Sequence, residues 1–409
     1  LRWNGFDYDP DRFWKAFQIS VKIAGLTPHS KVSAQVLSLI PVFILIGYLA
    51  YHAKLTVALF EAAKRWIAWV PGGLAVSTVF ATAGFAAVSG ASVATAAVFA
   101  RIAIPEMLKV GYNKAFAAGV VAAGGTLGIL IPPSTGFVIF AILTEQSIGR
   151  LFLAGVIPGL LLLAMFMLTV SIICYIRPSA GPRGPVTTWD EKRRAISGAF
   201  PILGVVVITI GGIYSGFFSP VEAAGVGAGL VIIYGIAKRR LSLVDFWGAS
   251  RSSVVTTATV MLILIGAHMI NPFLALSHLP TYVGETLVAL DLPVLGILAL
   301  MLLVYLVLGC FLEGFAMLVL TLPIFFPVVL ELGIDPIWFG VLVVLTLEMG
   351  LISPPVGINV FIVKSVAPNV SLSDIFRGVA PFWLAMLVTL IILIAFPQLS
   401  LFLPDTMFN

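Results

Sequence analysis

The chain has 409 residues, of which 60% are hydrophobic and only 10% are charged. Soluble domains carry about 25% charged residues and do not expose this much apolar surface, so the composition excludes a water-soluble protein. The net charge of +5 lies in short loops between apolar runs, where charge sets membrane topology, and it does not indicate a nucleic-acid surface.

Apolar runs of about 20 residues recur along the whole chain, and each is long enough to cross a hydrocarbon core of ~30 Å. Most of the 38 glycines and 25 prolines lie inside these runs, which is typical of membrane helices that are interrupted at defined places. The sequence has no P-loop, no metal-ligand spacing among its histidines and no nucleophile–base pair. We therefore predict an all-α polytopic membrane protein that moves a solute and is not an enzyme.

Residues 67–104 are predicted to form a re-entrant hairpin, which enters and leaves the membrane on the same side. Basic residues lie near both ends of it, at Arg65 and Arg101, so both ends carry cytoplasmic charge. Its return limb, 93–104, would measure only ~18 Å as a helix, which is too short to cross. The tip is expected at Ser89-Gly90-Ala91-Ser92.

Residues 115–145 would measure ~46 Å as one helix, more than a straight span requires. We expect an interruption between Gly128 and Ser134, because the adjacent Pro132 and Pro133 remove backbone donors and clash with the preceding turn. This segment is therefore predicted to cross the membrane as two half-helices.

The rest of the chain is predicted to contain a second hairpin and a second broken helix. The hairpin, at about 292–330, should turn at Gly309–Gly314, and the broken helix, 337–367, should be interrupted at Gly350–Pro355. Unbroken spans are expected at 152–176, 198–217, 221–237, 251–272 and 378–402.

A shift of 222 residues lays one half of the chain on the other and aligns Pro132-Pro133 with Pro354-Pro355. Aligned Pro-Pro pairs with aligned glycines around them are hard to obtain by chance, and secondary transporters are built from repeats of this kind. The predicted organisation is an atypical N-terminal segment 1–36, a first repeat 37–197, a linking helix pair 198–250 and a second repeat 251–409.

Loop charge indicates that the two repeats have opposite orientations. Residues 101–114 contain three basic residues and one acidic residue, a net charge of +2. Their partners at 323–336 contain only Glu331 and Asp335, a net charge of −2. By the positive-inside tendency the first loop is cytoplasmic and the second is external, so the repeats are inverted.

The hairpin tips and helix breaks are the candidate functional positions. In hydrocarbon an unpaired backbone group is costly, so irregular backbone at mid-depth survives where it is buried or lines a wet cavity. Half-helix N-termini suit an anionic solute. The alternative is that glycine and proline merely bend packed helices. Freed carbonyls can replace the water around Na⁺, as can the hydroxyls of Ser89, Ser92, Ser134 and Thr135.

The sequence allows two interpretations, functional or structural, for each of three acidic residues. A carboxylate inside an apolar segment is costly and usually functional. Glu313 and Glu348 therefore either ligate a cation or hydrogen-bond freed amides and hold a break open. Glu222 follows Pro220 at the start of a span, and we favour a helix cap there over a functional role.

These stretches resemble motifs of the DctM-like large membrane subunit of the tripartite ATP-independent periplasmic (TRAP) transporters. The resemblance runs from about Ser38 to the C-terminus. It implies an elevator-type fold in the bacterial inner membrane and Na⁺-coupled uptake of a small organic anion, such as a carboxylate, dicarboxylate or sugar acid. It also implies two partners, a small four-helix membrane subunit and a periplasmic solute-binding protein. The similar stretches are Ala87–Ser92, Leu127–Ser134, Ala154–Gly159, Pro220–Ala224 and Pro354–Gly357.

The resemblance places one Na⁺ site at each pair of hairpin tip and helix break. The first is expected at Ser89, Gly90, Ser92, Gly128 and Pro132. The second is expected at Gly309, Cys310, Glu313, Gly314, Gly350 and Pro354. The solute is expected at Ser134, Thr135, Gly357 and Asn359.

One departure concerns residues 1–36, which are polar and aromatic where the family begins with one or two hydrophobic spans. Either the chain is truncated or this segment belongs to a fused arrangement with the small subunit. The alternative function is an ion or solute channel or another uncoupled permease, and an intramembrane enzyme or structural partner is a third. A channel would require a continuous polar pore, whereas the polar positions here cluster at mid-depth.

Overall fold

The computed structural model describes residues 38–408 apart from 185–186 and 277–278, and near the start only Arg2–Trp3, Phe6–Asp7, Trp14 and Gln18. Strands β1 (Arg2–Trp3) and β2 (Phe6–Asp7) form a short antiparallel pair. The two interpretations of segment 1–36, a truncated chain or a fusion with the small subunit, concern residues that otherwise lie outside the described part of the chain. From residue 39 onward, every described element is a helix.

Two series of seven helices follow the same order: a first helix, a short helix, a hairpin of two helices, an interrupted pair and a long helix. The first series is α2 (Leu39–His52), α3 (Leu55–Ile67), α4 (Gly73–Ser89), α5 (Ser92–Lys109), α6 (Lys114–Leu130), α7 (Thr135–Thr144) and α8 (Ile148–Ile176). The second series is α11 (Leu243–Leu276), α12 (Leu279–Val288), α13 (Val294–Gly309), α14 (Gly314–Glu331), α15 (Pro336–Gly350), α16 (Ile358–Val366) and α17 (Leu372–Ala395). Between and after them lie η2 (Pro178–Ala180), α9 (Trp189–Tyr214), α10 (Pro220–Ala237) and α18 (Gln398–Phe408).

The predicted fold class is confirmed: the chain is all-helical, with two helix hairpins and two interrupted helices. The hairpins turn between α4 and α5 and between α13 and α14. Helices α6 and α7 meet at an angle of 41° across the first break. Among the described residues, six helices are long and apolar enough to cross a membrane, or eight if each bent pair counts as one span. The orientation of the repeats and the repeat boundaries stay predictions.

Several helices extend beyond the limits that apolar runs predicted. Helix α5 returns over Ser92–Lys109 rather than 93–104. Helix α11 begins at Leu243, because Ser242 caps its first turn by accepting a hydrogen bond from the Asp245 amide at 3.1 Å. The last predicted span, 378–402, is divided into α17 and α18. The polar cap at Ser242 thus sets the start of α11, which hydropathy alone does not locate.

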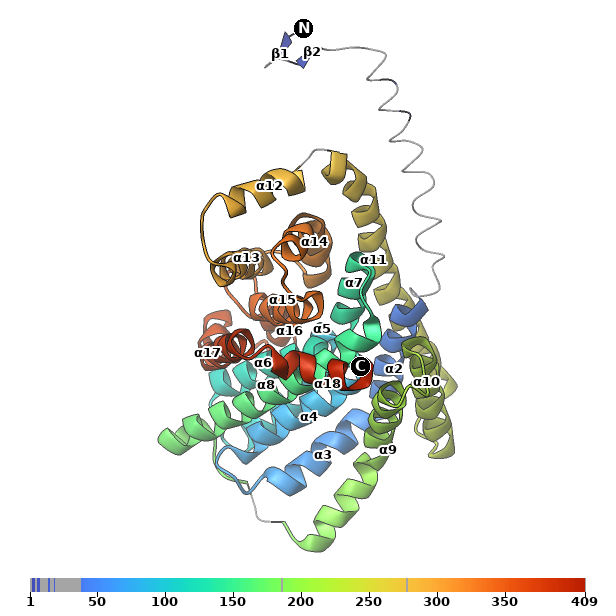
Figure 1. The fold of residues 1–409 in the computed structure, drawn as a ribbon. Coiled ribbons are helices and arrows are strands. Elements are labelled where there is room, and N and C mark those ends of the chain that lie inside the picture. Colours follow the sequence, from blue (N-terminus) through green and yellow to red (C-terminus); the bar gives the residue numbers. More distant parts are fainter. Residues whose placement is uncertain are drawn as a thin grey trace.

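The helices separate into two groups that two short helices connect (Figure 1). Helices α2, α9, α10 and α11 lie together on one side, where α2 packs against α10 and α11. The hairpins and interrupted helices form the other group. Helix α3, bent by 66° from α2, contacts both α9 and α4, and α12 contacts both α11 and α14. Each of these short helices therefore joins one group to the other.

The first hairpin is tied to its surroundings by polar contacts at its open end. Lys64 of α3 lies 3.2 Å from the Glu106 carboxylate of α5. Hydrogen bonds from Lys109 and Lys64 hold the pKa of Glu106 below its usual value. The Tyr112 hydroxyl accepts from the Leu74 amide at 3.2 Å and donates to a loop carbonyl, and burial raises the pKa of Tyr112 to about 12. These bonds fix the open end of α4 and α5.

The two series are joined by close packing of α6 against α17. A Cβ added to Gly119 would lie 2.2 Å from the carbonyl carbon of Gly378, so the two backbones are in direct contact. Small residues permit this kind of approach between membrane helices, where tight packing replaces the hydrophobic effect as the main source of association. The contact holds the first broken helix next to the last long helix of the second series.

We expect three engineered cysteines to report the inverted orientation. Ser179, Ser242 and Gly333 are all exposed, and the first two lie in basic loops. In a background without Cys174 and Cys310, Ser179→Cys and Ser242→Cys should react with an impermeant maleimide only from the cytoplasm. Gly333→Cys should react only from outside. Labelling of all three from one side would contradict the inverted repeat.

Candidate functional site

The first hairpin tip is fastened to the start of α7. The carbonyl oxygen of Gly90 accepts hydrogen bonds from the Thr135 amide at 3.2 Å and from the Thr135 hydroxyl at 2.7 Å. Gly90 has φ +59°, and a Cβ there would lie 2.6 Å from the Pro133 carbonyl oxygen. Glycine is therefore required both by the backbone conformation and by the close approach of the break.

The last turn of α6 lies against the same tip. A Cβ on Gly128 would be 2.7 Å from the Ala91 carbonyl oxygen and 2.8 Å from the Ser92 amide nitrogen. Gly90, Ser92 and Gly128 of the predicted first Na⁺ site are thus brought together at this tip. Pro132 is buried in the break that follows α6. The residues predicted for the first Na⁺ site therefore lie at one junction of tip and break, and Na⁺ binding there stays a prediction.

Ser89, the remaining residue of the first predicted site, lies at the edge of this junction. Its hydroxyl is 3.0 Å from the Thr95 hydroxyl of α5. A Cβ on Gly47 of α2 would lie 2.9 Å from the Ser89 Cα. The tip is therefore held between the first break and α2, which belongs to the other group of helices.

The second tip meets the second break in the same manner. A Cβ on Gly350 would lie 2.6 Å from both the Cα and the carbonyl carbon of Gly309. A Cβ on Gly314 would lie 2.6 Å from a Leu347 methyl group. The Cys310 thiol donates to the Leu306 carbonyl at 3.2 Å, and Pro354 is exposed. Gly309, Gly314 and Gly350 form the junction, while Pro354 lies at its surface.

Glu313 and Glu222 both cap the start of a helix. The Glu313 carboxylate accepts from the amides of Phe315 at 2.9 Å and Ala316 at 3.2 Å, and so it caps the start of α14. This is the amide-binding role left open from the sequence, and cation binding by Glu313 stays a prediction. Glu222 likewise caps a helix, forming a capping box with Ser219 at the start of α10, as favoured from the sequence.

The four predicted solute-binding residues lie at the starts of two half-helices. Ser134 caps α7: its hydroxyl donates to the Ile129 carbonyl and accepts from the Phe137 amide. Thr135 binds the first tip, as described above. Gly357 precedes α16 at φ +62°, and Asn359 lies buried in the first turn of α16. Solute binding at these four residues stays a prediction.

Ser92, Glu348 and Asn359 form a buried polar cluster between the two series. The Ser92 hydroxyl donates to Glu348 Oε2 at 2.8 Å, and Asn359 Nδ2 donates to Ser92 Oγ at 2.7 Å. The three residues are at most 1% exposed. Sequence reasoning assigned Ser92 to an ion site and Asn359 to a solute site and did not connect them. The only signal was that Glu348 lies in an apolar run.

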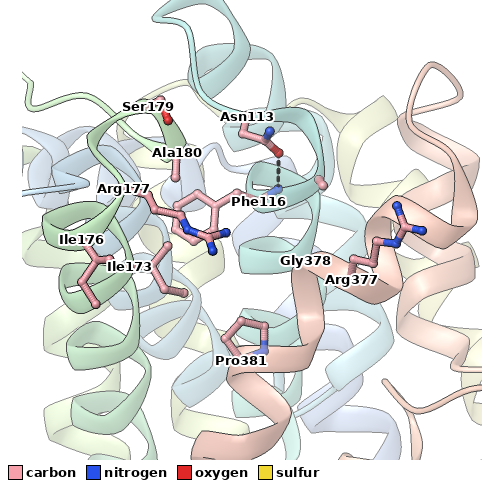
Figure 2. Close-up of a pocket in the computed structure, with 11 residues that line it drawn as sticks. Asn113, Phe116, Ile173, Ile176, Arg177, Ser179, Ala180, Arg377, Gly378 and Pro381 are labelled. Atoms are coloured by element: carbon pink, nitrogen blue, oxygen red, sulfur yellow. Dashed lines mark hydrogen bonds between the residues drawn. The ribbon is translucent and has the colours of Figure 1, made fainter.

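A separate cavity of about 490 Å³ lies where α6, α8 and α17 come together, away from both tips. Phe116, Ile173 and Pro381 contribute apolar surface, and Arg177 and Arg377 contribute positive charge. In Figure 2, Arg177 extends from the end of α8 into the space between α8 and α17. Both arginines lie in segments predicted to be cytoplasmic. None of the predicted site residues lines this cavity.

Comparison with known proteins identifies the family. The family model described as "Tripartite ATP-independent periplasmic transporter, DctM component" matches residues 13–399. The C4-dicarboxylate TRAP transporter large permease protein DctM of Pseudomonas aeruginosa is 38% identical, over 95% of this chain and 89% of that protein. The sialic acid large permease protein SiaM of Vibrio cholerae is 34% identical, over 90% and 85%. The ectoine large permease protein TeaC of Halomonas elongata is 31% identical, over 95% and 89%.

A solved structure supports the same fold. The crystal structure of the YdaH transporter of Alcanivorax borkumensis superposes with a TM-score of 0.65, at 15% sequence identity, over 97% of this chain and 90% of that one. The relatives above are named as transporter permeases and not as enzymes. The chain therefore belongs to the DctM family, the large permease components of tripartite ATP-independent periplasmic transporters.

Proposed function

We propose that this chain is the permease of a Na⁺-driven importer of a small organic anion, located in a bacterial inner membrane. The observation that supports it most is the repeated junction of a hairpin tip and a helix break, once around Gly90 and once around Gly350. The first junction gathers the carbonyl oxygens of Gly90, Ala91 and Pro133 with the Thr135 hydroxyl, and at the second the backbones of Gly309 and Gly350 are in direct contact. Oxygen atoms of this kind are the ligands that Na⁺ prefers.

The charge of the solute would be balanced without basic side chains. Residues 89–92 and 309–314 contain no lysine or arginine. The positive ends of the half-helices α7 and α16, together with bound Na⁺, would attract the anion instead. The three relatives named above are permeases for C4-dicarboxylates, sialic acid and ectoine, which makes a small organic solute the reasonable class.

An elevator motion fits the two groups of helices. In this proposal, α2, α9, α10 and α11 remain fixed against the small membrane subunit, while the hairpins and broken helices move together as one body. Helices α3 and α12 would be the connecting arms, since each contacts both groups. The solute would be delivered by a periplasmic binding protein, as in the tripartite transporters to which the relatives belong.

We expect more than one Na⁺ to accompany each solute. A tenfold Na⁺ gradient supplies about 1.4 kcal/mol per ion and a 100 mV potential about 2.3 kcal/mol per net charge. Two Na⁺ with a monoanion yield about 5 kcal/mol, above the ~4.1 kcal/mol needed for thousandfold accumulation. One Na⁺ with a monoanion yields only about 1.4 kcal/mol.

The test is uptake of labelled succinate, sialic acid and ectoine into proteoliposomes that contain the permease with its small subunit, in the presence of its binding protein. Uptake of the transported solute should require a Na⁺ gradient and should stop when K⁺ replaces Na⁺ at constant pH. Undiminished uptake in K⁺ would refute Na⁺ coupling. Absence of counterflow, with flux that never saturates, would favour the channel alternative.

A further inference from the structure

Glu348 is a buried carboxylate with one oxygen that has no partner. It lies in the last turn of α15, two residues before Gly350, and is 0% exposed. Its Oε2 atom accepts from the Ser92 hydroxyl, whereas Oε1 has no hydrogen-bond partner. The ion pairs recorded in the described part of the chain do not include Glu348. A carboxylate in this environment requires a positive partner if it is ionised.

Asn359 also has a buried oxygen without a hydrogen-bond partner. It is 0% exposed, and its Oδ1 atom also has no hydrogen-bond partner. Its Nδ2 atom donates to Ser92, and the Ser92 hydrogen is used in turn on Glu348. The three side chains therefore form one directed chain of donors that ends on the carboxylate. This series of hydrogen bonds leaves two buried acceptor oxygens, Glu348 Oε1 and Asn359 Oδ1, without a donor.

A small cation bound beside Ser92 would give both oxygens a partner. Carboxylate, amide and hydroxyl oxygens are hard ligands of the type that Na⁺ takes. We propose that Glu348, Asn359 and Ser92 form a third Na⁺ site, which adjoins the first tip junction through Ser92 and in which Glu348 is the anionic ligand. This inference rests on the proposed Na⁺-driven function and adds a site to it.

The position of the cluster gives the third site a specific consequence. Ser92 begins α5 at the tip of the first hairpin, whereas Glu348 and Asn359 lie on either side of the second break. A Na⁺ held by all three joins the tip of one repeat to the break of the other. Na⁺ therefore binds fully at this site only when both repeats are in position. Its binding couples the two tip sites to each other.

The test uses the permease purified with its small subunit, with Na⁺ as the only ligand. Glu348→Gln removes the charge but keeps the size and an acceptor for Ser92. Binding of ²²Na⁺ should fall by one ion per permease in this variant, or the weakest ion should bind at least tenfold less tightly. Glu331→Gln, an exposed glutamate at the end of α14, serves as the matched control and should bind as wild type.

Thermal unfolding in choline chloride and in NaCl separates this role from a purely structural one. Bound Na⁺ stabilises the folded state in proportion to its affinity. The rise of Tm on adding NaCl should be smaller in Glu348→Gln than in wild type, while its Tm in choline chloride should be unchanged or higher. If that variant does not fold, Asn359→Ala replaces it, because it removes the second free oxygen without touching the carboxylate.

Wild-type numbers and affinities of bound Na⁺ in both variants would overturn the third site. The proposed function would survive that result as long as wild type still binds Na⁺ and requires it for uptake. Absence of Na⁺ binding by wild type itself would instead overturn the proposed function. The two failures are therefore distinguishable in one series of measurements.

Discussion

Replacement of Gly90 by valine is expected to lower Na⁺-driven uptake about a hundredfold. Valine would have to adopt φ +59°, which costs a residue with a Cβ about 1–2 kcal/mol. Its Cβ would also lie 2.6 Å from the Pro133 carbonyl oxygen, and such overpacking costs about 1–3 kcal/mol more. Because 1.4 kcal/mol corresponds to a factor of ten, about 3 kcal/mol at the junction gives roughly a hundredfold loss.

Gly333→Val separates backbone strain from the loss of the junction. Gly333 has φ +67°, but a Cβ there has no neighbour within 4 Å. Uptake at equal amounts of folded protein in the membrane should therefore be reduced much less in Gly333→Val than in Gly90→Val. Equal losses in both variants would show that the contact between tip and break does not contribute to transport.

Ser89→Ala at the same tip gives a finer measurement. The Ser89 hydroxyl contacts only Thr95 among the hydrogen bonds recorded for it, so its loss should leave the fold intact. If Ser89 ligates Na⁺, the Na⁺ concentration for half-maximal uptake should rise about five- to thirtyfold, from about 1–2 kcal/mol for one weak ligand. Ser171→Ala, on α8, is the control. An unchanged Na⁺ requirement would remove this hydroxyl from the site.

The sequence located the tips and breaks because their signals are local. Tandem prolines such as Pro132-Pro133 cannot continue a helix, and a glycine such as Gly90 between two apolar runs marks a turn. The repeat of these signals at a constant offset then predicted the order of helices in the second series from that in the first. Features that depend on neighbours in the chain were therefore predictable.

Contacts between the repeats were not predictable in this way. The cluster of Ser92, Glu348 and Asn359 joins residues more than 250 positions apart, and the cavity between Arg177 and Arg377 joins α8 to α17. Hydropathy and spacing do not determine which helices pack against each other. Packing of small residues, such as Gly119 against Gly378, determines it. Only the cost of burying Glu348 indicated that a partner existed.

At the second tip, alanine in place of each of the two facing glycines, Gly350 and Gly309, is expected to reduce uptake by different amounts. A Cβ on Gly350 would lie 2.6 Å from the backbone of Gly309, whereas a Cβ on Gly309 would lie 3.2 Å from the Gly350 Cα. Gly225 of α10 has nothing within 4 Å and is the control. A methyl group at Gly350 therefore forces the tip and the break further apart than one at Gly309, since backbone atoms cannot rotate away as a side chain can.

Gly350→Ala should therefore reduce uptake about five- to 150-fold, the range that corresponds to about 1–3 kcal/mol of overpacking. Gly309→Ala should have an intermediate effect, and Gly225→Ala should transport as wild type. Uptake is compared at equal amounts of folded protein, and the Na⁺ concentration for half-maximal uptake is measured for each variant. A larger effect of Gly309→Ala than of Gly350→Ala would contradict the contact geometry. Equal, wild-type behaviour of all three would exclude the second junction from the transport site.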